Sequence, residues 1–161
     1  MIKEVSGDIL LTTAQAIAHG IAPNDDFHQG LALSLREQWP SLYKDFRHYC
    51  KTAHPESGAV WLWASAEGRR IVNLLTQEGS YDAGTKPGVA QLKFVRHALQ
   101  NLRELVKKEG LKSIALPRLA TGVGRLAWED VLPLIKENLG DLGIPVYVYS
   151  TYQKGVKAKE A

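Results

Sequence analysis

The sequence predicts an α/β protein in which helices cover both faces of a mixed, largely parallel sheet of about six strands. Two observations predict this class. Apolar runs of strand length alternate with amphipathic helical patterns throughout the second half of the chain. In addition, two of the strands are each followed by a polar loop that contains glycine and then by a helical pattern. Because ligands of such proteins bind beyond the carboxyl ends of the strands, both loops are expected to border one site.

The first half of the chain contains apolar runs of strand length and two helical patterns. Strands are expected at residues 2–5, 16–21, 59–64 and 70–76, and helices at residues 31–38 and 40–54. The second helix is amphipathic because Leu42, Phe46 and Cys50 recur at helical spacing. Residues 65–69 join the last two strands as a hairpin turn.

The second half begins with the longest helix, expected at residues 89–108. Its apolar positions recur at intervals of three and four residues, at Leu92, Val95, Leu99, Leu102 and Val106. Gly110 ends this helix. A strand at residues 113–116, a helix at 128–139 and a strand at 145–150 complete the chain.

A long polar loop at residues 76–88 follows the strand 70–76. Loops of this length are uncommon in compact domains and often carry function. The residues in it that are capable of chemistry are Glu78, Tyr81, Asp82 and Lys86.

The composition is that of an ordinary globular protein, with 45% hydrophobic and 23% charged residues in a length that fits one domain. Cys50 is the single cysteine, which excludes an intramolecular disulfide and metal sites built from several cysteines. His48 and His54 lie near it, but their spacing matches no recognised ligand set, so we expect no metal and no cofactor. No apolar run approaches a membrane span and the first residues lack the apolar region of a signal peptide, so we expect a cytoplasmic protein without membrane association.

The net charge is +3, and Lys154, Lys157 and Lys159 account for much of the excess. The rest of the chain is nearly balanced, which gives little support to direct nucleic-acid binding, although it does not exclude it. We expect one domain at residues 1–152, a basic, disordered tail at residues 153–161, and a monomer.

The stretch LPRLATGVGRLAW at residues 116–128 lies between a buried strand and a helical pattern. Gly122 and Gly124 let the backbone adopt positive φ and approach a ligand closely. The helix expected to begin near Leu126 offers free N–H groups and the positive end of its dipole, which suit a phosphate or diphosphate. The alternative is a glycine turn that only connects a strand to a helix, since neither a P-loop lysine nor the third glycine of a dinucleotide fingerprint is present.

Residues 22–30, APNDDFHQG, repeat the arrangement of strand, polar loop and helix. Two such loops in one domain can clamp a diphosphate from both sides. His19 lies on the apolar strand before this loop, where a hydrogen-bonded core histidine is a commoner role than a catalyst. Asp8 follows Gly7 and is either a helix cap or a carboxylate that accepts a hydrogen bond from a base amino group.

Three motifs occur in the order and spacing of a known family. VSGDIL at residues 5–10, AHGI at residues 18–21 with the polar loop to Gly30, and LPRLATGVGRLAWEDV at residues 116–131 together resemble the macrodomains that bind ADP-ribose. The sequence is most similar to the group of the terminal ADP-ribose protein glycohydrolase and the chromatin-remodeller macrodomain, from residue 2 to about residue 149. The resemblance implies a three-layer α/β/α fold with an ADP-ribose cleft along one edge of the sheet.

The resemblance also implies roles for individual residues. Asp8 would accept a hydrogen bond from the adenine amino group, assisted by the Ile9 amide, and the two loops would hold the diphosphate and the distal ribose through backbone amides. The other ligand-binding residues that it implies are His19, Gly30, Leu31, Pro117, Thr121, Gly122, Val123, Gly124, Arg125 and Leu126.

The sequence departs from the glycohydrolase at its catalytic positions. That enzyme uses a lysine directly after the threonine that ends the fourth strand, together with an aspartate in the late loop. The matching residues here are Gln77 and Gly124, neither of which exchanges a proton near neutral pH. His28 places an imidazole near the expected position of the distal ribose.

Two functional classes therefore stay open. The first is an enzyme that hydrolyses a group on the distal ribose, by de-ADP-ribosylation, O-acyl-ADP-ribose deacylation or processing of ADP-ribose 1″-phosphate. Its candidate catalytic residues are His28 and Glu78. The second class is a non-catalytic reader of ADP-ribose or of an ADP-ribosylated macromolecule. Binding of RNA or poly(ADP-ribose) would need a larger positive field than the sequence shows.

Overall fold

A computed structural model describes residues 1–81 and 88–161. In this part of the chain six strands form one sheet in the order β1-β6-β5-β2-β4-β3. The strands are β1 (Ile2–Gly7), β2 (Ala16–Ile21), β3 (Val60–Ala64), β4 (Arg70–Leu75), β5 (Ile114–Pro117) and β6 (Val146–Tyr152). Neighbouring strands are parallel except β3, which is antiparallel to β4. The expected mixed, largely parallel sheet is confirmed.

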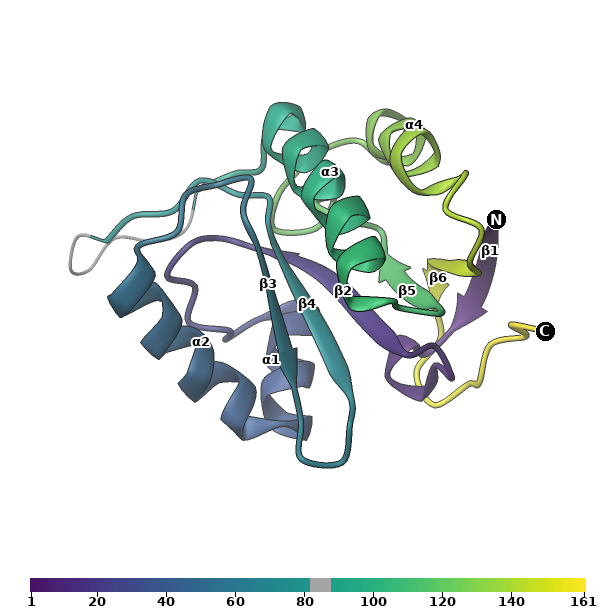
Figure 1. Ribbon diagram of the computed structural model, residues 1–161, viewed down its shortest axis with the longest axis horizontal. Helices are drawn as coiled ribbons and strands as arrows, with labels where there is room; N and C mark the ends of the chain where they lie inside the picture. Colours follow the sequence, from purple (N-terminus) through teal and green to yellow (C-terminus); the bar gives the residue numbers. More distant parts are fainter. Residues whose placement is uncertain (82–87) are drawn as a thin grey trace.

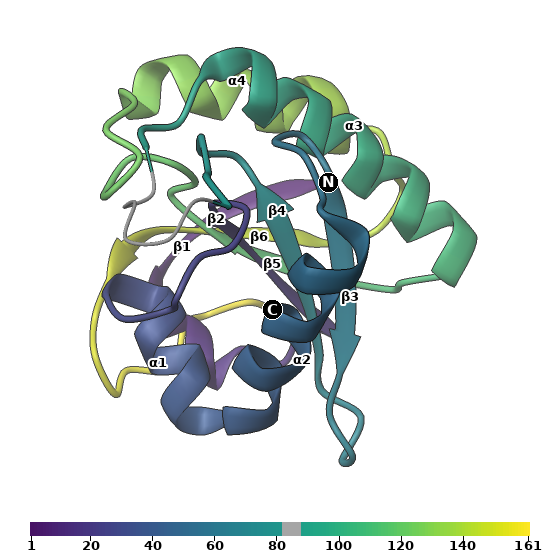
Figure 2. The same cartoon turned by 90° about the vertical axis from the view of Figure 1, so that its left-hand side faces the viewer.

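Helices cover both faces of the sheet (Figure 1). They are α1 (Gly30–Gln38), α2 (Pro40–Ala53), α3 (Leu92–Glu109) and α4 (Trp128–Leu139), and a short 3-10 helix, η1 (Ile9–Leu11), follows β1. Figure 2 shows α3 and α4 on one side of the sheet, and α1 and α2 on the other. This arrangement is the expected three-layer α/β/α fold.

Strand β2 shows how the sequence builds two hydrophobic cores. Successive side chains of a strand point to opposite faces. Ala16 and Ala18 belong to the core beneath α3 and α4, whereas Ile17 and Ile21 belong to the core beneath α1 and α2. Strand β2 lies between β5 and β4, and helices pack over both of its faces, which explains why its sequence is almost continuously apolar.

Helix α3 begins at Leu92, three residues later than its apolar spacing indicates. The reason is that Ala90 forms an isolated bridge with Gln77 and donates its amide to the Gly124 carbonyl at 3.0 Å. At its other end, the helix stops as predicted at Gly110, which adopts a left-handed conformation with φ of 63°.

The first and last strands of the chain pair with each other. Strand β1 continues to Gly7 and β6 to Tyr152, beyond their expected ends, because the last residues of the two strands pair in parallel. The apolar residues that follow β1 form η1.

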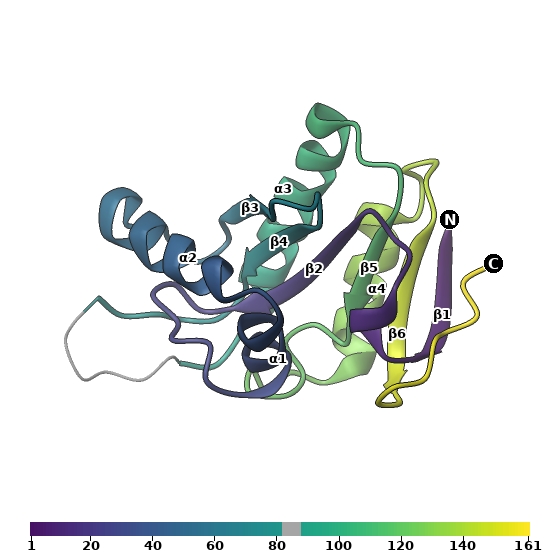
Figure 3. The same ribbon diagram turned by 90° about the horizontal axis from the view of Figure 1, so that it is seen from below.

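Residues 153–161, which we call the C-terminal strap, pack against the domain rather than extending as the disordered tail that their lysines indicate. The Gln153 amide donates to the Gly7 carbonyl at 3.0 Å, and Ala158 is buried in the core that contains Val5 and Ile9. The strap leaves β6 and runs back beside β1 (Figure 3). Its lysines are exposed, so the contacts come from its backbone and from its non-lysine side chains.

Some expectations concern features other than the fold. No helix among residues 1–81 and 88–161 is long and apolar enough to cross a membrane. Within the same residues, no group of three histidine, cysteine, aspartate or glutamate side chains is suited to hold a metal ion. Asp82 and Lys86, expected in the long loop, lie outside the described residues. The cytoplasmic location and the monomeric state stay predictions.

Candidate functional site

A cleft of about 770 Å³ opens at the carboxyl ends of β2 and β5. Residues of the loop after β2 and of the loop after β5 line this cleft. Both loops lie at the same edge of the sheet (Figure 2). The sequence-predicted residues that line it are His19, His28, Gly30, Leu31, Pro117, Gly122, Val123, Gly124 and Arg125. The two glycine-containing loops therefore share one cleft, as expected.

The loop after β5 keeps a run of backbone amides free for a ligand. The amides of Arg125 and Leu126 donate to the carbonyls of Gly122 and Ala120 at 3.1 and 2.9 Å, and these bonds fold the loop. The amides of residues 121–124 have no acceptor in the part of the chain that the structure describes. Consecutive free amides of this kind form a concave donor set that suits an anion.

The free amide donors near residue 124 are not the ones that the sequence predicts. Helix α4 begins at Trp128 rather than near Leu126, so the free amides belong to the loop and not to the first turn of the helix. Gly124 is required here because a Cβ atom would lie 2.6 Å from the Ala120 carbonyl oxygen and 2.9 Å from the Ala90 side chain. The close contact between the loop and residue 90 therefore depends on glycine.

The loop after β2 ends in a second set of free amides. Helix α1 begins at Gly30, which has a φ of 63°, and the amides of Gly30, Leu31 and Ala32 belong to its first turn. Amides of a first turn have no partner within the helix, and the side chain of the N-cap residue, Gln29, does not cap them. These three residues line the same cleft as residues 122–124.

Asp25 holds the loop after β2 in shape. Its carboxylate accepts hydrogen bonds from the amides of Phe27 and Ala22, at 2.9 and 3.3 Å. Burial raises the pKa of Asp25, and the two backbone hydrogen bonds oppose that rise. Phe27 and Asn24 have φ values of 56° and 60°, so the carboxylate stabilises a backbone conformation that is unfavourable for residues with a side chain.

An imidazole and a carboxylate are paired at the mouth of the cleft. Nδ1 of His28 contacts Oδ1 of Asp26, and both residues line the cleft. More than half of the His28 side chain is exposed, at 58%. Its other nitrogen is therefore available to a ligand or to water. Arg118 and Arg125 lie across the cleft on the loop after β5 and are also exposed.

His19 lies at the inner end of the cleft and is 1% exposed. Its ring is hydrogen-bonded to Asn73 on the neighbouring strand β4. The structure therefore confirms the interpretation of His19 as a hydrogen-bonded core histidine, and places it beside the cleft as well.

Comparisons with known proteins agree with this geometry. The family model described as Macro domain matches residues 80–135. The structure of the macrodomain of Thermus aquaticus DarG is 25% identical, with a TM-score of 0.82 over 93% of this chain and 98% of that chain. The chain has the macrodomain fold, and residues 80–135 match the model of that family. A DarTG structure of Thermosipho africanus in complex with ADP-ribose, at 24% identity and a TM-score of 0.82, shares the fold over 97% of this chain and 42% of that one.

Two curated relatives carry enzyme names. A DNA ADP-ribosyl transferase-DNA ADP-ribosyl glycohydrolase fusion protein of Thermosipho africanus is 29% identical over 164 residues, which cover 94% of this chain and 42% of that protein. The ADP-ribose glycohydrolase OARD1 of Homo sapiens is 25% identical over 150 residues, which cover 92% of this chain and 91% of that protein. This macrodomain thus spans less than half the length of the first curated relatives that it matches.

Gln77 occupies the position where the resemblance to the glycohydrolase predicts a nucleophile. Its side chain is 5% exposed, donates to the Gly88 carbonyl at 3.1 Å and borders the cleft. The backbone carbonyl of Gln77 accepts a hydrogen bond from the Ser57 hydroxyl at 2.8 Å. In this macrodomain the position therefore carries a fixed, neutral amide.

Other predicted site residues do not line the cleft. Glu78 is exposed and contacts Gln91. The Thr121 hydroxyl donates to the Arg118 carbonyl at 3.0 Å, and the Leu126 amide is used within the loop. Asp8 and Ile9 lie farther along the sheet edge, after β1. The ligand-binding roles of these residues, and the catalytic role of Glu78, stay predictions.

Three charged residues line the cleft that were not predicted from the sequence. Asp25 and Asp26 are part of a stretch rich in turn formers, a composition that indicates a loop but not which side chain faces a ligand. Arg118 directly follows β5, and a charged residue immediately after a strand that ends at a site was the available signal.

Proposed function

We propose that this macrodomain binds ADP-ribose, with the diphosphate held between the free amides of residues 30–32 and 122–124. The observation that carries the proposal is that both sets of amides line one cleft. Backbone amides bind phosphate oxygens without requiring a basic cluster, which agrees with the nearly balanced charge of the domain. Arg118 and Arg125 add positive charge at the rim.

The proposed orientation follows from the two ends of the cleft. The distal ribose would lie toward His28 and Gln77, and the adenine toward Asp8 and Ile9 at the end of β1. The name of the Thermosipho africanus complex states that a related protein binds ADP-ribose. The resemblance of the motifs supports the same orientation in this chain.

For the chemistry, we propose hydrolysis of the bond between the distal ribose and the group attached to its anomeric carbon. A water molecule attacks that carbon while Nε2 of His28 accepts the water proton. The bond to the leaving atom breaks, and its electron pair departs with that atom, which receives a proton from solvent. The Asp26 carboxylate, in contact with Nδ1, stabilises the resulting imidazolium.

The substrate is defined by the group that is attached to the distal ribose. The curated relatives are named as glycohydrolases of ADP-ribose or of ADP-ribosyl groups on DNA, which supports a nucleic-acid or protein carrier for the ADP-ribose. O-acyl-ADP-ribose and ADP-ribose 1″-phosphate are further candidates, because both carry their group on the distal ribose.

A reader without activity is the second candidate, and Gln77 and Gly124 favour it. These residues stand where the related glycohydrolase has its lysine and aspartate, and neither supplies a nucleophile or a base. A reader would use the same cleft and the same amides, but would release its ligand unchanged.

The test measures binding and turnover on the same protein. Calorimetry with ADP-ribose is expected to show binding, and absence of binding would contradict the function. Incubation with DNA-linked ADP-ribose, glutamate-linked ADP-ribose, O-acetyl-ADP-ribose and ADP-ribose 1″-phosphate is expected to release ADP-ribose from at least one. Tight binding without release from any of them would assign the reader function instead.

A further inference from the structure

The C-terminal strap holds η1 at both of its ends. At the first end, the Gly155 amide donates to Oδ2 of Asp8 at 3.0 Å, and the Asp8 amide donates to the Val156 carbonyl at 2.7 Å. The strap approaches so closely that a Cβ atom on Gly7 would lie 2.8 Å from that carbonyl oxygen. Asp8 is thus tied to the strap by its backbone and by its side chain.

At the second end, the Glu160 carboxylate accepts four hydrogen bonds. The Thr13 amide and hydroxyl donate to Oε1 at 3.0 and 2.6 Å, and the hydroxyls of Thr12 and Tyr149 donate to Oε2 at 2.5 Å each. Burial raises the pKa of Glu160, but these hydrogen bonds outweigh it and keep the pKa below its ordinary value. Glu160 is therefore ionised and is an acceptor for all four donors.

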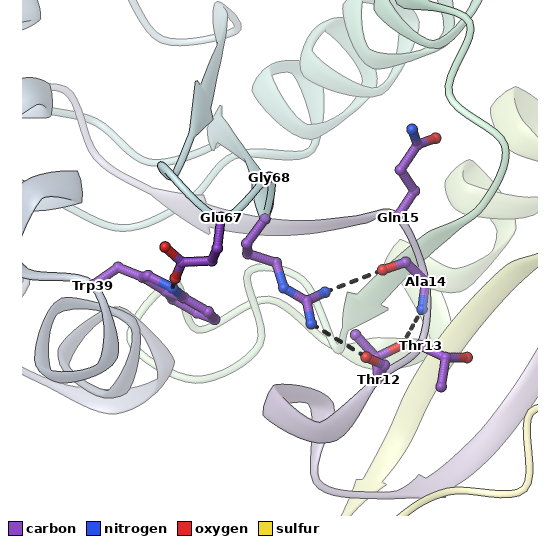
Figure 4. Close-up of a pocket in the computed structure, with 8 residues that line it drawn as sticks. Thr12, Thr13, Ala14, Gln15, Trp39, Glu67 and Gly68 are labelled. Carbon is purple, nitrogen blue, oxygen red and sulfur yellow. Dashed lines mark hydrogen bonds between the residues drawn. The ribbon is translucent and has the colours of Figure 1, made fainter.

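The turn that Glu160 holds is also fixed from its other side. The Arg69 guanidinium donates to the carbonyls of Ala14 and Thr12 at 3.1 and 3.4 Å, and the Ala14 amide donates to the Thr12 hydroxyl at 3.1 Å (Figure 4). A hollow of about 390 Å³ lies beside these contacts, near the start of β2 and β4. Residues 12–14 are thus clamped between Arg69 and the strap.

The hydrogen bonds that Asp8 accepts restrict the orientation of its side chain. Its Oδ1 accepts the Leu10 amide at 3.0 Å and its Oδ2 accepts the Gly155 amide, which together set the plane of the carboxylate. The side chain is buried, with the whole residue 7% exposed. The Ile9 amide, by contrast, has no acceptor in residues 1–81 or 88–161.

We infer that the strap is a positioning element for base recognition, in which Glu160 and the Gly155 amide hold Asp8 and Ile9 in the arrangement that reads adenine. This inference rests on the proposed function. Adenine presents an amino donor beside a ring-nitrogen acceptor, which match the Asp8 carboxylate and the Ile9 amide. Hypoxanthine presents an oxygen acceptor beside a protonated nitrogen, so both contacts become unfavourable.

The contacts indicate that the strap prepares Asp8 for ligand binding and does not block it. Each carboxylate oxygen has two lone pairs, and each accepts one backbone amide here, so acceptor capacity remains on both. Ordering an acceptor before the ligand arrives lowers the entropy lost on binding. Removal of the strap anchors should therefore weaken adenine recognition, whereas an obstructing strap would strengthen binding when released.

The test compares ADP-ribose with inosine 5′-diphosphate ribose, in which hypoxanthine replaces adenine. Glu160→Gln cannot accept all four hydrogen bonds, and is expected to weaken ADP-ribose binding about fivefold while changing the binding of the inosine compound less. Tyr149→Phe removes one donor and should give a smaller change in the same direction. Lys159→Gln alters charge on the exposed side of the strap and is the matched control, expected to leave both affinities unchanged.

A ligand-free measurement separates this inference from the proposed function. Hydrogen exchange of the Leu10 and Gly155 amides, both donors to Asp8, should be faster in Glu160→Gln and unchanged in Lys159→Gln. An unaltered preference for adenine, unaltered exchange, or tighter ADP-ribose binding in Glu160→Gln would overturn the inference. Failure of the wild-type protein to bind ADP-ribose would contradict the proposed function, and the exchange rates would then show whether the strap orders Asp8.

Discussion

Nε2 of His19 lies 2.7 Å from Oδ1 of Asn73, its register partner on β4. The Asn73 amide group donates to the Trp61 carbonyl at 3.2 Å, so Oδ1 is the acceptor of the pair and Nε2 carries the proton. The ring also lies edge-on to Phe27, with 5.8 Å between the ring centroids. Burial lowers the pKa of His19 to about 4, and the hydrogen bond that His19 donates to Asn73 opposes this shift. His19 is therefore neutral at physiological pH.

This pair predicts a loss of stability in mild acid. The unfolded chain protonates this histidine near its ordinary pKa of 6.5, whereas the folded protein keeps it neutral until the pH approaches about 4. Acid therefore favours the unfolded state between these values, and above pH 6.5 the contribution is flat because both states are neutral. Urea unfolding across this range should show the free energy of unfolding fall by at most about 3 kcal/mol from this residue.

The control separates the contribution of His19 to the pH dependence from that of the carboxylates, which also titrate in acid. His19→Gln retains a donor toward Asn73 but does not titrate, so its unfolding free energy should depend less on pH. His48→Gln, at an exposed position on α2, should keep the wild-type dependence. Equal pH dependence in wild type and His19→Gln would contradict the assignment of a neutral buried ring.

The two glycines of the loop after β5 are expected to differ in their effect on stability. Gly124→Ala places a Cβ against the Ala120 carbonyl and should lower the free energy of unfolding by about 1–3 kcal/mol, because the loop must separate from residue 90. Gly122→Ala is the matched control, since a Cβ there meets nothing within 4 Å. Thermal or urea unfolding measures both, and equal destabilisation would show that this loop is not packed as described.

Substitution of Gly122 is expected to affect the affinity for ADP-ribose rather than the stability of the fold. Gly122→Val should leave a folded protein that has lost measurable ADP-ribose affinity, because its branched side chain would extend from the loop into the cleft where the diphosphate is proposed to lie. Calorimetry with ADP-ribose measures the loss, and Ala66→Val, which introduces the same branched side chain in the exposed turn between β3 and β4, is the control. Normal affinity in a folded Gly122→Val protein would remove the diphosphate from this position.

Much of the fold was predictable because its signals are local. The spacing of apolar residues in α3, the glycine at its end and the small and large residues that alternate along β2 are all visible in short windows. The convergence of the two loops followed from topology, since the carboxyl ends of parallel strands meet at one edge of the sheet.

The strap and parts of the site were not predictable in this way. Glu160 bonds to Thr12 across 148 residues of sequence, and neither residue carries a pattern that indicates the other. Exposed lysines dominate the composition of the strap and conceal the buried Ala158. Glu78 was a candidate because it can act as an acid or base, but the chain turns its neighbour Gln77 toward the cleft.

The pair of His28 and Asp26 gives the final prediction, which concerns turnover. His28→Gln should lower kcat about 100-fold or more on whichever ADP-ribose derivative is hydrolysed, because glutamine cannot accept the proton of the attacking water. KM should change little, since most of the ring is exposed. Asp26→Asn should lower kcat less, by removing the charge that stabilises the imidazolium, and His48→Gln should leave kcat unchanged. Steady-state release of ADP-ribose by the four proteins measures these effects, and an unaltered kcat in His28→Gln would mean that a water held by the substrate itself, and not this imidazole, begins the reaction.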